Sequence, residues 1–77
     1  MIIKNKRTKE KLVISRKEFE TRFERELAHG LECYKRLELS KPYFNFKTES
    51  SIEADYYSSL QWSFNHLCIS DWYIERI

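Results

Sequence analysis

The feature that most constrains this fold is a long apolar stripe at helical spacing, which begins directly after a helix-start signal. Ser15 precedes the stripe and Glu18 follows three residues later, a pattern typical of a helix N-cap. The apolar residues then recur every three or four positions: Phe19, Phe23, Leu27, Leu31, Tyr34 and Leu37. This predicts a helix over residues 15–38, ended before Pro42. Gly30 lies inside it and either allows a close approach of another element or is simply tolerated.

A second apolar stripe predicts another helix over residues 50–69. Its spacings are again three and four, at Ile52, Tyr56, Leu60, Phe64 and Leu67. We expect Ser50 or Ser51 to be its N-cap. Between the two helices, the aromatic residues 43–47 form either a connector or a short edge strand.

Short runs rich in β-branched and aromatic residues flank the two helices. Two such runs, separated by a polar turn, predict a β-hairpin over residues 1–14, and residues 72–77 predict a final strand. The order β-β-α-α-β indicates an α+β fold of one domain, residues 1–77. We expect a three-stranded antiparallel sheet covered on one face by a helical hairpin. The last strand should lie antiparallel to the second strand, with the first strand as the alternative neighbour.

The chain carries no recognisable catalytic pattern. It has a single glycine, so neither a Gly-x-Ser-x-Gly motif nor a glycine-rich phosphate loop is present. We expect Cys33 and Cys68 to be buried and unpaired, and His29 and His66 to be structural. No enzyme activity, cofactor or metal is therefore expected. The few cysteines, the polar start and the absence of a long apolar stretch predict a cytoplasmic protein.

The charge of the chain is unevenly distributed. Residues 1–17 hold seven basic residues and one acid, whereas residues 41–77 hold three basic residues and five acids. Five of the basic residues cluster around the expected hairpin turn: Lys4, Lys6, Arg7, Lys9 and Lys11. Such a cluster either binds phosphates or an acidic protein surface, or keeps the hairpin solvated and its edge protected from aggregation.

A second candidate surface is aromatic and acidic. Five Phe, five Tyr and two Trp are more rings than a small core can hide, so we expect some of them at the surface. Tyrosine and tryptophan contribute strongly to protein interfaces. The candidates are Tyr43, Phe44, Tyr57, Trp62, Asp71, Trp72 and Tyr73. The alternative is that most of these rings pack the sheet against the helices.

The two ends of the chain resemble small proteins encoded by phages and mobile elements of Gram-positive bacteria. The resemblance lies in Ile2-Ile3-Lys4-Asn5-Lys6, in Leu12-Val13-Ile14-Ser15-Arg16-Lys17-Glu18-Phe19 and in Ser70-Asp71-Trp72-Tyr73-Ile74-Glu75-Arg76-Ile77. Such proteins include anti-CRISPR proteins, which bind Cas nucleases and block DNA loading or cleavage. The resemblance implies a phage-encoded inhibitor that binds a Cas nuclease with its guide RNA in the bacterial host. It contains no functional motif, so no site residue follows from it.

Two other functions fit the sequence. The first is a small nucleic-acid-binding regulatory protein that uses the basic hairpin. The second is a structural subunit that associates through exposed aromatic residues. The sequence leaves the partner and the oligomeric state open.

Overall fold

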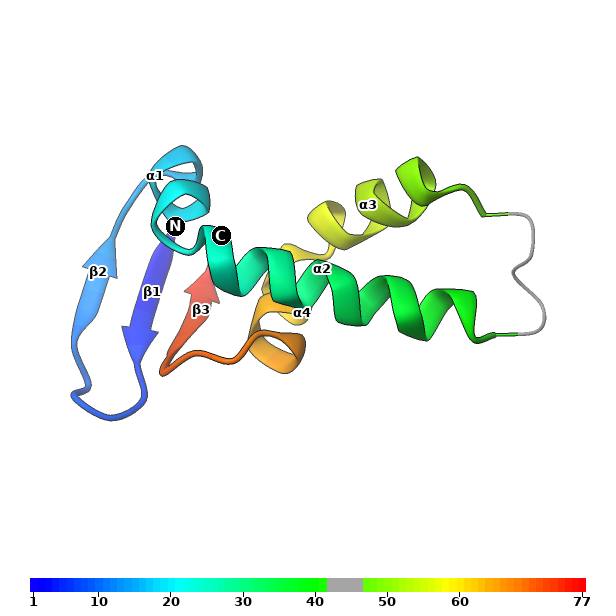
Figure 1. Cartoon of the computed structure of the whole chain (residues 1–77). Helices are drawn as coiled ribbons and strands as arrows, with labels where there is room; N and C mark the ends of the chain where they lie inside the picture. The colour runs from blue at the N-terminus through cyan, green and yellow to red at the C-terminus, as the bar shows by residue number, and fades with distance from the viewer. Residues whose placement is uncertain (42–46) are drawn as a thin grey trace.

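The computed structural model describes residues 1–41 and 47–77. The elements, in chain order, are β1 (Ile2–Asn5), β2 (Lys11–Val13), α1 (Arg16–Arg22), α2 (Glu24–Leu39), α3 (Glu49–Ser58), α4 (Leu60–Leu67) and β3 (Trp72–Arg76) (Figure 1). The predicted α+β fold is confirmed, and every predicted element corresponds to an observed one. The aromatic connector or edge strand predicted for residues 43–47 lies, apart from Lys47, outside the described residues.

The three strands form an antiparallel sheet with β1 in the centre, in the order β2-β1-β3. Ile3 pairs with Leu12 on one side and with Ile74 on the other. The expectation that the last strand would lie beside the second was therefore wrong. β1 contributes Ile3, which is completely buried, whereas β2 carries exposed Lys11 and Val13, and exposed residues of this kind suit an edge strand.

Each predicted helix is bent into two segments. The bends lie at Phe23, with φ −110° and ψ 31°, and at Ser59, with φ −103° and ψ 33°. Hydrogen bonds of helical spacing continue through both bends, for example from the Leu27 amide to the Phe23 carbonyl and from the Ser63 amide to the Ser59 carbonyl. The bends are therefore kinks in two long helices. Beyond the second kink, α4 packs on both α2 and β3.

The two helix starts differ in how well the sequence located them. Ser15 caps α1 as predicted, since its Oγ accepts a hydrogen bond from the Glu18 amide at 3.1 Å. The second cap is Thr48 rather than Ser50 or Ser51, because the Thr48 Oγ1 accepts from the Ser51 amide at 3.2 Å. Thr48 has the extended backbone that an N-cap requires, so the helix begins before the two serines.

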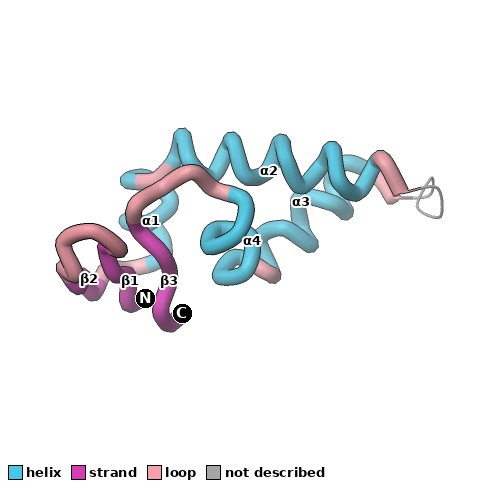
Figure 2. Tube along the Cα trace, turned by 90° about the horizontal axis from the view of Figure 1, so that it is seen from below, coloured by secondary structure: helices cyan, strands magenta, loops and turns pink. Residues whose placement is uncertain are grey.

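The core lies at one end of an elongated molecule of 41 × 22 × 19 Å. It joins the sheet to the helices through Ile3, Phe19, Phe23, Leu27, Tyr56, Leu60, Phe64 and Ile74. The distal half of α2 and the start of α3 extend beyond the sheet (Figure 2). Ion pairs connect the two helices there, from Lys35 to Glu53 at 2.6 Å and from Lys47 to Glu38 and Asp55.

Candidate binding surfaces

The β1–β2 turn brings the five basic residues of the hairpin to one end of the sheet. Asn5 fixes the turn, because its Oδ1 accepts hydrogen bonds from the Arg7 amide at 2.9 Å and the Thr8 amide at 3.0 Å. Lys9 adopts a left-handed conformation with φ 63°. Lys6, Arg7 and Lys9 are exposed around this turn. We call Lys4, Lys6, Arg7, Lys9 and Lys11 the hairpin cluster.

Carboxylates of the C-terminal segment compensate part of this charge. Arg7 pairs with Asp71 at 3.3 Å, and Glu75 lies 3.5 Å from Lys4 and 4.0 Å from Lys11. Exposed pairs of this kind contribute about 0–1 kcal/mol each to stability. Their larger effect is to lower the positive charge that the cluster presents to a partner. Within residues 1–41 and 47–77, no carboxylate pairs with Lys6 or Lys9.

The sheet has one face without helices, and it is polar. Ile3, Leu12 and Ile74 contribute to the core on the helix side. The alternation of side chains along a strand therefore places Lys4, Lys11, Val13, Tyr73 and Glu75 on the opposite face. Asp71 and Tyr73 thus belong with the hairpin cluster. Trp72 lies on the other side, where its ring packs edge-on against Phe23 with centroids 6.4 Å apart.

Trp62 lies on the outer side of α4 and is 51% exposed. Its ring stacks on the imidazole of His66, with centroids 4.9 Å apart and an interplanar angle of 19°. The Nδ1 of His66 is 2.8 Å from the Trp62 carbonyl oxygen, which fixes the imidazole against the helix. Ile77, at the end of the chain, lines the same groove of about 530 Å³ together with Gln61 and Asn65. We call Trp62, His66 and Ile77 the α4 face.

The other aromatic candidates that the structure describes do not join the α4 face. Tyr57 borders a different groove of about 470 Å³, beside Leu27 and Leu31. There the guanidinium of Arg16 donates a hydrogen bond to the Tyr57 carbonyl at 3.0 Å. Tyr43 and Phe44 lie outside the described residues. The aromatic candidates are therefore spread over several sites, and no single surface contains them all.

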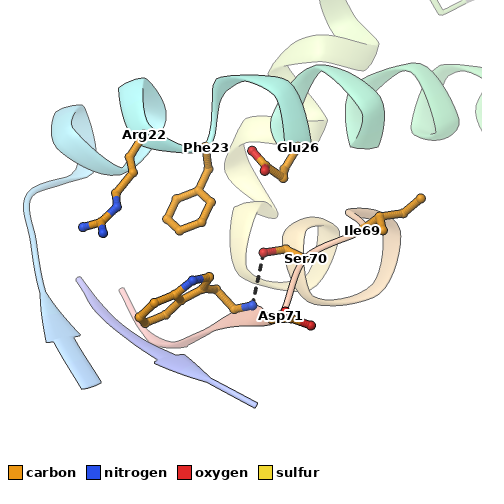
Figure 3. Close-up of a pocket in the computed structure, with 7 residues that line it drawn as sticks. Arg22, Phe23, Glu26, Ile69, Ser70 and Asp71 are labelled. Carbon is orange, nitrogen blue, oxygen red and sulfur yellow. Dashed lines mark hydrogen bonds between the residues drawn. The ribbon is translucent and has the colours of Figure 1, made fainter. Parts of the chain in front are cut away.

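A third groove, of about 510 Å³, lies between the α1–α2 kink and the segment that precedes β3. Figure 3 shows Arg22, Phe23 and Glu26 on one side and Ile69, Ser70 and Asp71 on the other. The Ser70 Oγ accepts a hydrogen bond from the Trp72 amide at 3.1 Å. Sequence analysis missed this groove, although Ile69, an isoleucine at the end of the predicted second helix and outside its apolar stripe, is a recognisable signal. Its charges are of mixed sign and indicate no ligand class.

The two cysteines are partly buried, whereas both histidines are exposed. Cys33 and Cys68 are unpaired and half-buried, less buried than expected. Burial is the main reason that the pKa of the Cys68 thiol is raised, which keeps it protonated and unreactive near neutral pH. His29 Nε2 lies 3.6 Å from Cys33 Sγ, a contact that their spacing of four residues on a helix could have predicted. Among the described residues no three His, Cys, Asp or Glu side chains are grouped as metal ligands.

None of the helices formed by the described residues has the length and apolar character needed to cross a membrane. Comparisons of the chain with protein-family models, with curated proteins and with solved structures gave no match.

Proposed function

We propose that this protein is a non-enzymatic inhibitor that binds another protein stoichiometrically, and that the partner is a bacterial defence nuclease of the Cas type. The α4 face is the observation that carries protein binding. The choice of a nuclease rests on the resemblance of the two chain ends to phage and mobile-element proteins.

The α4 face has the properties of an interface centre. A tryptophan that is stiffened by stacking on His66 loses little conformational freedom when a partner covers it. Ile77, which is 58% exposed, extends the apolar area, and Gln61 supplies a polar rim. Residues of this type contribute about 2 kcal/mol or more when they lie at the centre of a protein interface.

The hairpin cluster would make a second, weaker contribution to binding of the nuclease complex. Lys6 and Lys9 would reach guide RNA or DNA held by the nuclease, while Asp71 and Glu75 balance the rest of the cluster. Lys6 and Lys9, which pair with no carboxylate of the described residues, correspond to a salt dependence of roughly two counterions, which is too small for tight binding to free nucleic acid. Direct nucleic-acid binding remains the second candidate function, because Tyr73 lies beside Lys4 on the uncovered face.

The test is an affinity pull-down from a bacterial lysate that expresses a type II CRISPR nuclease, with and without nucleic-acid digestion. We expect the Cas protein to stay bound after digestion and its DNA cleavage to be blocked at equimolar inhibitor. Trp62→Ala should weaken binding by about 30-fold, the equivalent of 2 kcal/mol. Leu39→Ala is the matched control, since Leu39 is also an exposed apolar residue but lies at the distal end of α2.

Three other outcomes would favour a different function or contradict the proposed one. Retention of nucleic acid alone, lost on digestion, would favour the nucleic-acid-binding function. Equal binding by Trp62→Ala and the native protein would show that the α4 face does not bind the nuclease. Retention of neither Cas protein nor nucleic acid would contradict a target in this system.

A further inference from the structure

The two edges of the sheet differ in how their backbone groups are satisfied. At the β3 edge, Asn65 of α4 takes the place of a neighbouring strand. Its Nδ2 donates to the Ile74 carbonyl at 2.9 Å and its Oδ1 accepts from the Ile74 amide at 2.7 Å. Gln61 adds a hydrogen bond to the Glu75 carbonyl at 3.1 Å. This edge is therefore closed to another strand.

The β2 edge is open. Hydrogen bonds from the Ile14 amide to Met1 and from the Asn5 amide to Glu10 show that the even-numbered residues of this strand face β1. The alternation of an antiparallel ladder then directs the amides and carbonyls of Lys11 and Val13 outward. No other described residue bonds these four groups. Val13 is also 75% exposed, so no residue in 1–41 or 47–77 covers its side chain.

We propose that the β2 edge binds an extended acidic segment of the partner protein, which adds to the sheet as a fourth strand. The inference rests on the proposed function only in taking the partner to be a protein. Main-chain hydrogen bonds would supply the register, and the side chains beside them the specificity. The edge offers only two amides and two carbonyls, so it would orient a partner that the α4 face also holds.

Charge selects the occupant of this edge. Between Lys6 and Lys17 the chain carries six basic residues and one acid, Glu10. A second copy of the chain would bring two such segments together, and like charges at that distance oppose pairing. An acidic segment is attracted instead.

The register makes the expected sequence of the segment more specific. Lys11 and Val13 both point to the uncovered face, two residues apart. An antiparallel partner strand would therefore place an apolar residue beside Val13 and an acid beside Lys11, two positions later in its own sequence.

The test uses amide-resolved NMR with a synthetic peptide, acetyl-Ser-Val-Thr-Glu-Thr-Glu-amide, at millimolar concentration. In the free protein the amides of Lys11 and Val13 should exchange quickly with solvent, whereas those of Leu12 and Ile14 are protected. The peptide should shift and protect the Lys11 and Val13 amides. Replacing its glutamates with lysines should abolish both effects.

Two variants isolate the edge. Val13→Pro removes one outward amide but leaves the hydrogen bonds to β1 intact, so it should fold and lose the peptide response. Val13→Thr keeps the amide and the β-branched shape, and should retain the response. Absence of shifts at Lys11 and Val13 in the native protein, or equal shifts with the lysine peptide, would overturn the inference. The result is independent of the pull-down, so either proposal can fail while the other stands.

Discussion

Gly30 shows at the scale of one residue how α2 accommodates its neighbours. A Cβ atom at this position would lie 2.5 Å from the Sγ of Cys68 and 2.6 Å from the hydroxyl of Tyr56. The Tyr56 hydroxyl donates to the Leu27 carbonyl at 3.1 Å, one turn earlier in α2. The glycine therefore permits the close approach that sequence analysis left open, at a helix-propensity cost of about 1 kcal/mol.

Gly30→Ala should destabilise the protein by about 1–3 kcal/mol, because the added methyl group overpacks a filled site. Urea unfolding followed by circular dichroism would measure the change in unfolding free energy. Arg25→Ala, on an exposed position of the same helix, is the control and should change stability little. A Gly30→Ala protein as stable as the native one would contradict the close packing.

At the scale of elements, α4 closes the β3 edge with a side chain. Asn65→Ala should leave the amide and carbonyl of Ile74 without their partners and cost about 1–3 kcal/mol. It should also expose a strand edge that pairs with other copies, so light scattering should detect association that increases with concentration. Gln61→Ala should have the smaller effect, since its hydrogen bonds are 3.1 and 3.4 Å long. A monomeric Asn65→Ala variant of unchanged stability would refute this role.

The stability of the end of α2 that lies away from the sheet should depend on pH through Glu38. This buried carboxylate accepts a hydrogen bond from Lys41 at 3.0 Å and lies 3.5 Å from Lys47. The hydrogen bond from Lys41 is the main reason that the pKa of Glu38 is lowered from its ordinary value of 4.5. A lowered pKa in the folded state means that the interaction contributes its full stability above about pH 4.5 and loses it as the pH falls through the folded-state pKa.

We therefore expect the unfolding free energy to decrease below about pH 4.5, and Glu38→Gln to reduce that decrease. Urea titrations of the native protein and the variant at neutral and acid pH would measure it. Glu10→Gln is the control, since the Glu10 side chain makes no ion pair with any residue in 1–41 or 47–77. An identical pH dependence in the native protein and Glu38→Gln would exclude Glu38 as the source.

The elements were predictable because their signals are local. The stripe from Phe19 to Leu37 and the Ser15 cap lie within one stretch of chain, so short-range spacing suffices to locate a helix. The exact start of the second helix was not predictable, because Thr48, Ser50 and Ser51 all carry hydroxyl groups that can cap it. The kinks at Phe23 and Ser59 were not predictable either, because neither position carries the proline or glycine that usually marks a kink.

The binding surfaces were predictable only as residue types. The basic hairpin cluster followed from five neighbouring positions, but its pairing with Asp71 and Glu75 depends on β3 lying beside β1, more than sixty residues away in the chain. The sequence left open which of Trp62 and Trp72 is exposed. Only the packing of α4 and β3 leaves Trp62 outside and turns Trp72 toward Phe23.

At the scale of the whole molecule, stability should be unevenly distributed along the long axis. Most of the buried aromatic and aliphatic residues form one cluster at the sheet end, with Ile52 of α3 buried outside it, whereas Leu37 and Leu39 at the distal end of α2 are exposed. We expect the amides near these two leucines to exchange through local opening, and those of Leu27 and Phe64 only through global unfolding. Native-state hydrogen exchange in low denaturant would measure both, and a uniform exchange free energy would contradict this gradient.

The register of the sheet also decides where the chain ends lie. Ile2 pairs with Arg76, so the first and last residues are neighbours at one corner of the molecule (Figure 1). Only a few added residues would therefore be needed to close the backbone into a ring, and new termini could then be opened elsewhere. An affinity tag on either end would leave from that same corner, close to Ile77 of the α4 face, so the tag itself would compete with a partner for that surface.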